Sequence, residues 1–298
     1  MTIAACFLST EGVVLGADST STLFVAGRVG QPGSQHHFDY AQKVFEVGGP
    51  GSTVGMALWG LGSLGDTSYR TLIAQIADEA GKKDLTSLDE VAQLAAALLW
   101  DCYGQSYGGW LARARELEAK GNSRTEAETS ELLSWRQALS GGFCLGGRWG
   151  SNRQPRAFEV SFGPLMADPP KPKELTLHSP SFWGCPNLIS RLIRGMDRDT
   201  FVQIMTSGKW NGTTDDLLAI LEHGALGQPS DLPLREAIDW IYASIYTTIK
   251  AMKFSHLAPV CGGPIEIAVI CSDRPFRWVR HKRLGEAIAA HQFQEDWV

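Results

Sequence analysis

The sequence predicts an α+β fold, a four-layer αββα sandwich of two antiparallel sheets flanked by helices. Strand-like runs fill the first sixty residues, two helical stretches follow, and strands, two more helices and final strands complete the chain. Two sheets packed face to face, with helices outside each, let every element in this order bury one face. No internal repeat or low-complexity segment is evident. We therefore expect one domain over residues 1–298, with a helical insertion near 110–138 and a mixed insertion near 197–230.

Four strands are expected in the first sixty residues, and we expect them to form one sheet. The first two runs meet at Thr10-Glu11-Gly12, a glycine-bearing turn typical of a β-hairpin. A loop rich in Gly, Pro, Ser and His follows over about 27–39. The four strand-like runs are residues 2–9, 12–18, 43–48 and 52–60.

Two helices are expected next. Residues 64–80 place apolar side chains at a helical period. A second helix should begin at Ser87, because Glu90 three residues later completes a capping-box signature. Gly108-Gly109 should interrupt this helix. The charged stretch 110–138 then predicts an exposed helical excursion whose charges face solvent.

The second half returns to strands and helices. A polar turn joins strand-like runs at 142–148 and 156–162, and a further run covers 175–184. Helices are expected from about 186 and over 233–252, where leucine and isoleucine side chains fall on one stripe. The final elements should be strands at 264–271 and 276–279 and a helical tail.

Composition favours a soluble cytoplasmic protein that needs no cofactor. A net charge of −5 and a pI near 5.8 offer no broad attraction for nucleic acid or anionic lipid. The N-terminus lacks the basic and apolar regions of a signal peptide, and no apolar run could cross a bilayer. The six cysteines form no CxxC pair, which favours reduced thiols. His36-His37 could bind zinc, but with no second cluster nearby in sequence we expect a polar loop and no metal site.

Three polar residues stand where the early strands should converge: Thr2, Asp18 and Lys43. A threonine hydroxyl needs a base to become a useful nucleophile. If Met1 is trimmed, Thr2 supplies an α-amine with an unperturbed pKa of about 7.7 to 8.0. Lys43 would lower that pKa and stabilise an alkoxide, and Asp18 would hold Lys43. From spacing alone, Asp18 could equally cap a turn and Lys43 could be a solvated edge-strand residue.

The same region resembles the opening of 20S proteasome β-subunits and their bacterial homologues, which are N-terminal-nucleophile hydrolases. The resemblance rests on blocks in family order: TIAACFLSTEGVVLGADSTST at 2–22, KVFEV at 43–47, GSLGD at 62–66 and GGPIEIAVI at 262–270. It implies the N-terminal-nucleophile hydrolase fold, with Thr2 as nucleophile and base and with Asp18 and Lys43 as charged support. It also implies that the Gly62 N–H is the oxyanion donor, with Gly60 as a rival, and that the Thr22 backbone pairs with extended peptide.

The chain departs from this family around the threonine amine. The family usually has a serine where the block GCPN places Cys185, and an aspartate and a serine where this chain has Ala258 and Cys261. A thiol donates a weaker hydrogen bond than a hydroxyl, and alanine offers none. Ser255 or His256 could fill the gap, and Cys185 and Cys261 are possible auxiliary residues. The departures imply slower proton transfer.

The resemblance implies a threonine peptidase that forms an acyl-enzyme on Thr2 inside a ring, or stacked rings, of identical subunits. Its substrates would be peptides or unfolded proteins, and an ATPase unfoldase is a conceivable partner. One alternative is a non-catalytic or weakly active ring subunit or peptide-binding scaffold of the same fold. Another is a small-amide hydrolase, since a fold does not dictate its substrate.

Overall fold

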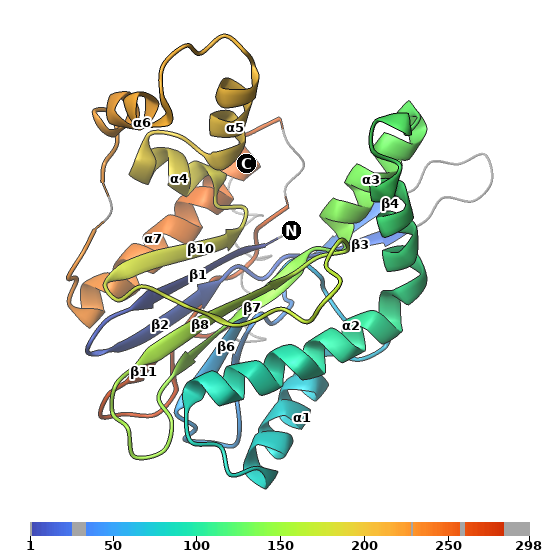
Figure 1. The fold of residues 1–298 in the computed structure, drawn as a ribbon. Coiled ribbons are helices and arrows are strands. Elements are labelled where there is room, and N and C mark those ends of the chain that lie inside the picture. The colour runs from blue at the N-terminus through green and yellow to red at the C-terminus, as the bar shows by residue number, and fades with distance from the viewer. Residues whose placement is uncertain (1, 26–33, 228, 257–259, 283–298) are drawn as a thin grey trace, which may run out of the picture.

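Two five-stranded antiparallel sheets and one two-stranded hairpin organise the chain (Figure 1). The computed structural model describes residues 2–25, 34–227, 229–256 and 260–282. The strands are β1 (Ile3–Leu8), β2 (Gly12–Ala17), β3 (Ser21–Val25), β4 (Ser34–Phe38), β5 (Val44–Glu46), β6 (Val54–Trp59), β7 (Gly141–Gly147), β8 (Arg156–Phe162), β9 (Lys173–Glu174), β10 (Ser179–Gly184), β11 (Glu266–Cys271) and β12 (Arg277–Arg280). The first sheet has the order β10-β1-β2-β11-β12 and the second the order β5-β6-β7-β8-β9.

The helices divide between the two sheets and a small group of their own. They are α1 (Tyr69–Lys82), α2 (Leu88–Ala119), α3 (Glu126–Ala138), α4 (Asn187–Arg194), α5 (Arg198–Thr206), α6 (Thr214–Glu222) and α7 (Leu234–Lys253), with a 3₁₀ turn at Gly121–Ser123. In Figure 1, α7 lies along the first sheet and α1 and α2 lie along the second.

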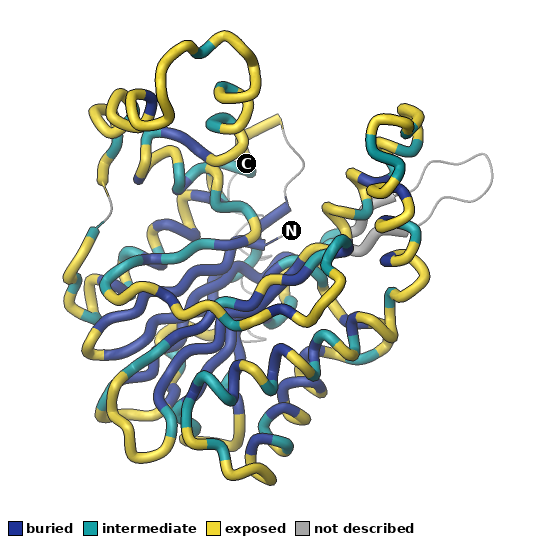
Figure 2. The backbone as a smooth tube through the Cα atoms, in the orientation of Figure 1, coloured by how far each residue is buried: buried dark blue, intermediate teal, exposed yellow. Residues whose placement is uncertain are grey.

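The core consists of apolar clusters on either side of each sheet. One joins the first sheet to α7, through side chains such as Phe7 and Ile241. A second lies between the sheets and includes Leu15 and Trp59. A third joins the second sheet to α1 and α2. Figure 2 shows the strands as the most continuously buried part of the backbone. The mixed α+β class with antiparallel sheets is thus confirmed.

The prediction that the first sixty residues form one sheet is wrong. Strands β1 and β2 belong to the first sheet, β5 and β6 belong to the second, and β3 pairs with β4. Every position of β1, β2 and β6 is buried, so these strands show no alternation of apolar and polar residues. Their sequences therefore do not indicate to which sheet each strand belongs. The expected loop at 27–39 also contains β4, and its residues 27–33 lie outside the described chain.

Gly108-Gly109 does not interrupt the second helix, which runs on to Ala119. A glycine costs a surface helix only about 1 kcal/mol relative to alanine. Here the next turns are stabilised by packing, because Leu111 is buried and Leu117 packs against Leu132 of α3. The helical prediction for 110–138 is confirmed, but its charges are not simply solvated. Arg113 pairs with Glu131 through two 3.0 Å hydrogen bonds that join α2 to α3.

The stretch expected to be mixed, 197–230, contains α5 and α6. Each helix begins at a side-chain cap, Asp197 for α5 and Thr213 for α6. The predicted helical tail lies outside the described residues. No helix in the described part of the chain is long and apolar enough to cross a membrane.

Candidate functional site

A buried ion pair lies at the junction of the two sheets. Lys43 Nζ is 2.7 Å from Asp18 Oδ1, and their side chains are 10% and 0% exposed. Asp18 follows β2 in the first sheet, whereas Lys43 precedes β5 in the second. The two charges expected to pair therefore meet in the structure. Only the crossing of the chain between the sheets brings them together.

Asp18 also organises the backbone around it. Its Oδ1 accepts a hydrogen bond from the Ile3 N–H at 3.1 Å, and its Oδ2 accepts from Thr20 N–H at 3.2 Å and Gly262 N–H at 2.9 Å. These donors come from the start of β1, the turn after β2 and the segment before β11. With Lys43 the carboxylate has four donors, so a charge that would be costly to bury is satisfied.

Thr2 lies beside this carboxylate, one residue before β1 and only 3% exposed. Its neighbour Ile3 donates directly to Asp18. On the other side, Gly184 has a φ of +83°, and a Cβ there would lie 1.8 Å from the Thr2 carbonyl oxygen. Only glycine fits this contact, so the end of β10 holds the Thr2 backbone closely.

The loop after β6 brings one of the two rival glycines next to the segment that follows Asp18. Gly60 has a φ of +85°, and a Cβ there would lie 2.3 Å from the Ser140 carbonyl oxygen, so backbone packing alone accounts for this glycine. A Cβ on Gly62 would instead meet Ser21 Oγ at 3.0 Å. Tyr107 of α2 holds the same loop by donating from its hydroxyl to the Ser63 carbonyl at 2.9 Å.

Two cysteines flank the pair. Burial raises the pKa of the Cys185 thiol, and Asp18 raises it further, while Lys43 and a hydrogen bond from the Thr2 backbone oppose the rise. Burial, with the negative charge of Asp18 next in importance, raises the pKa of Cys261 to about 12. Both thiols are therefore protonated at neutral pH. All six cysteines lie in the described part of the chain, and no disulfide joins any of them.

The other predicted residues are less closely involved. Thr22 lies in β3, where its hydroxyl is 3.1 Å from His37 Nδ1. Ala258 lies outside the described residues. Ser255 and His256 are exposed, and the Ser255 hydroxyl donates to the Met252 carbonyl at the end of α7. No group of three or more metal-ligating side chains occurs among the described residues, so His37 has no such cluster around it there.

A second charged group beside the pair was missed from the sequence. Glu266 of β11 is 0% exposed and lies opposite Ala17 in the sheet, one residue before Asp18. Lys282 and His281 approach its two oxygens. One signal was present in the sequence: Glu266 is the only charged residue in the apolar run PIEIAVIC. Such a carboxylate needs a buried partner.

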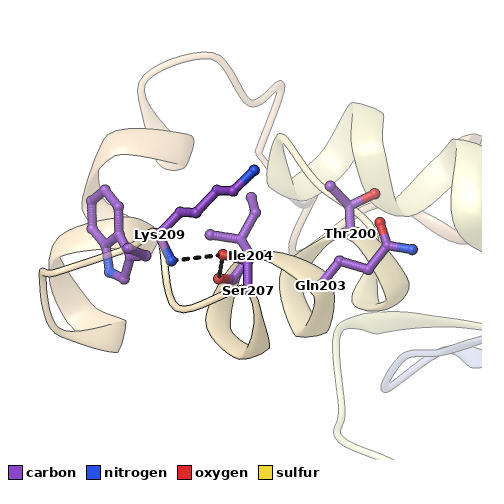
Figure 3. Close-up of a pocket in the computed structure, with 6 residues that line it drawn as sticks. Thr200, Gln203, Ile204, Ser207 and Lys209 are labelled. Atoms are coloured by element: carbon purple, nitrogen blue, oxygen red, sulfur yellow. Dashed lines mark hydrogen bonds between the residues drawn. The ribbon is translucent and has the colours of Figure 1, made fainter.

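Two cavities in the described part of the chain lie away from the Asp18–Lys43 pair. One, of about 330 Å³, is formed by α5 and the loop after it (Figure 3), where Ser207 Oγ accepts from the Lys209 N–H at 3.1 Å. The other, of about 340 Å³, lies near the far end of β1, between Leu8 and the Arg156–Glu174 ion pair. Neither is lined by Thr2, Asp18 or Lys43.

Comparison with known proteins gives structural likeness at low sequence identity. No family model matches the chain, and no curated protein matches it. Among solved structures, the Anbu (Gly-1) mutant from Hyphomicrobium sp. strain MC1 is similar over 100% of this chain and 98% of its own. The sequence identity is 15% and the TM-score is 0.48. A likeness of this degree assigns neither a family nor an activity to the chain.

Proposed function

We propose that this protein is a threonine-type hydrolase in which Thr2 is the nucleophile. Removal of Met1 would make Thr2 the N-terminal residue. The observation that carries the proposal is the buried Asp18–Lys43 pair, whose carboxylate also binds the N–H of the residue after Thr2. Burying two charges costs free energy, and apolar residues of similar volume often stabilise a fold as much as a buried ion pair does. Its position beside a threonine at the start of a strand supports a chemical role.

In the proposed reaction, the Thr2 hydroxyl oxygen attacks the carbonyl carbon of an amide. Its proton passes to the free α-amine of Thr2, and from there to the leaving nitrogen as the C–N bond breaks. Water then hydrolyses the resulting ester, which releases the acid and restores the hydroxyl. Lys43, a cation beside the amine, favours the amine's neutral form and the developing alkoxide.

The oxyanion donor in this proposal is the N–H of Gly62. Gly60 has a separate structural explanation in its close contact with Ser140, whereas Gly62 approaches Ser21 in the segment after Asp18. One donor of this type is worth about 10² to 10³ in rate.

The proposed substrates are extended peptides or unfolded proteins, taken up beside Thr22 by strand addition. The proposed architecture is a four-layer αββα sandwich, which is consistent with apolar clusters on both faces of each sheet. The proposed assembly is a ring of identical subunits. Exposed apolar side chains on α5 and α6, among them Val202 and Ile220, are compatible with self-association.

One observation favours a second candidate, a weakly active or non-catalytic scaffold of the same fold. The side chain beside Asp18 at position 261 is a thiol with a pKa of about 12. A neutral thiol is a weak hydrogen-bond donor. Proton transfer that relies on this thiol would be slower than proton transfer through hydroxyl groups.

The test is covalent labelling of the purified protein with a peptide vinyl sulfone, to which an activated hydroxyl adds without a leaving group. Intact mass should rise by one probe in the wild type and in Thr2→Ser, but not in Thr2→Ala. The exposed Thr10 provides the matched control, because Thr10→Ala should label like the wild type. N-terminal sequencing should begin at Thr2. Retained Met1 together with no labelling would favour the scaffold, and equal labelling of Thr2→Ala would refute the nucleophile.

A further inference from the structure

A second cluster of charged side chains lies next to the Asp18–Lys43 pair in the fold. Its centre is the carboxylate of Glu266, which is fully buried in β11. Lys282 Nζ lies 3.1 Å from Glu266 Oε2, and His281 Nδ1 lies 2.8 Å from Oε1. His281 is itself stacked on Trp278 of β12, with ring centroids 4.2 Å apart. Residues that follow the last strand thus return to the sheet and meet a buried acid.

Lys282 connects this cluster to both segments that carry the ion pair. Its ammonium donates to the Ala41 carbonyl oxygen at 2.8 Å and to Ser19 Oγ at 3.3 Å. Ser19 follows Asp18, and Ala41 lies two residues before Lys43. The two segments also bond to each other, because the Ala41 N–H donates to the Ser19 carbonyl at 2.9 Å. A single ammonium therefore spans the junction at which Asp18 and Lys43 meet.

Burial of this arrangement has an electrostatic cost. Burial lowers the pKa of Lys282, and the nearby Lys43 adds to that effect, while Glu266 and Asp18 oppose it. The two oxygens of Glu266 face His281 and Lys282, one each, so the buried carboxylate is paired with these two groups. A lone buried carboxylate would destabilise the fold. Four side chains that can carry charge, Asp18, Lys43, Glu266 and Lys282, lie together here, although apolar residues of similar volume are often as stabilising as buried ion pairs.

We propose that Lys282, held by Glu266, is a positioning residue that fixes the spacing between Asp18 and Lys43. This inference rests on the proposed Thr2 chemistry, because it assigns Lys282 a role in that reaction. Lys282 acts on the pair through Ser19 and Ala41. A displacement of about 1 Å in a catalytic group can cost about 10²-fold in rate.

The experiment measures the rate of vinyl sulfone labelling as a function of probe concentration. Lys282→Met removes the ammonium and keeps an unbranched side chain of similar length. We expect the maximal labelling rate to fall by about 10- to 100-fold, with the half-saturating probe concentration unchanged. Lys282→Arg should recover most of the rate, since it restores both the charge and the donors. Lys82→Met is the matched control, because it breaks an exposed Lys–Glu pair on α1 and should leave the rate unchanged.

A double variant separates positioning from stability. Glu266→Gln/Lys282→Met removes both charges and leaves no unpaired buried carboxylate, so it should fold even if Lys282→Met does not. We expect the double variant to label as slowly as the single one. Wild-type labelling kinetics in the double variant would overturn the positioning role and leave the proposed function intact. Absence of labelling in the wild type would overturn both.

Discussion

At the scale of single residues, Asp18 is the most constrained side chain of the candidate site. It is fully buried, pairs with Lys43 and accepts hydrogen bonds from three backbone N–H groups. A carboxylate can accept all four because it presents two acceptor oxygens. An amide of the same shape cannot, since one of its two terminal atoms is a donor.

We therefore predict that Asp18→Asn lowers the free energy of unfolding by about 3 to 5 kcal/mol, the cost of leaving one member of a buried ion pair alone. Urea unfolding followed by circular dichroism measures this change. Asp78→Asn on the exposed face of α1 is the control, and its effect should stay within about 0.5 kcal/mol. Equal effects of the two variants would mean that the Asp18–Lys43 pair is not buried in solution.

At the scale of elements, the junction between α4 and α5 depends on one cap. Asp197 is 2% exposed, and its carboxylate accepts from the Thr200 N–H at 3.0 Å and from Arg191 of α4. Burial acts to raise the pKa of Asp197, but the bonds from Thr200 and Arg191 outweigh it and lower the pKa from 3.8 to about 2. The folded state thus binds this proton less readily than the unfolded chain.

The sign of the pH dependence follows from that lowered pKa. The contribution of Asp197 is complete above pH 4 and is lost as the pH falls towards about 2. We predict that Asp197→Ala costs about 0.5 to 2 kcal/mol at pH 6, and that the difference from wild type shrinks between pH 4 and pH 2.5. Urea titrations at several pH values measure this difference in the free energy of unfolding. Asp215→Ala, in the first turn of α6, is the control and should lower the free energy of unfolding by less than Asp197→Ala does. If the difference between wild type and Asp197→Ala stayed constant from pH 4 to pH 2.5, the capping role of the Asp197 carboxylate would be contradicted.

At the scale of the whole molecule, the contact between the two sheets decides where the site forms. Leu15 is fully buried in the cluster between them, and a Cβ on Gly55 of the facing sheet would lie 2.9 Å from its Cδ1. This close packing leaves little room for the sheets to slide. The positions of Asp18 and Lys43, which stand on different sheets, depend on it.

Leu15→Ala should lower the free energy of unfolding by about 2 to 5 kcal/mol, because the rigid strands around it cannot collapse into the cavity. Denaturant unfolding of the variant tests this, with Leu133→Ala as the control. Leu133 is 58% exposed on α3, and its truncation should change stability by no more than about 0.5 kcal/mol. Similar losses in both variants would show that the sheets do not pack at Leu15.

The sequence by itself determined the fold class, most of the elements and the main charged pair. Helical periodicity located α1 and α7, and apolar runs bounded by turn residues located most of the strands. The sequence also predicted Asp18 and Lys43 as partners, because both charged residues stand at strand ends. The capping signature of Ser87 and Glu90 likewise marked the start of α2, which begins at Leu88 with Ser87 as its N-cap.

Only the tertiary structure decided how these parts are distributed. Strands buried at every position look alike in sequence, so the division of the first sixty residues between two sheets depended on packing. The continuation of α2 past Gly108-Gly109 depended on contacts with α3. The approach of Lys282 to Ser19 joins residues 263 positions apart. Local patterns cannot encode such long-range contacts, because burial and electrostatics set them only after the chain has closed.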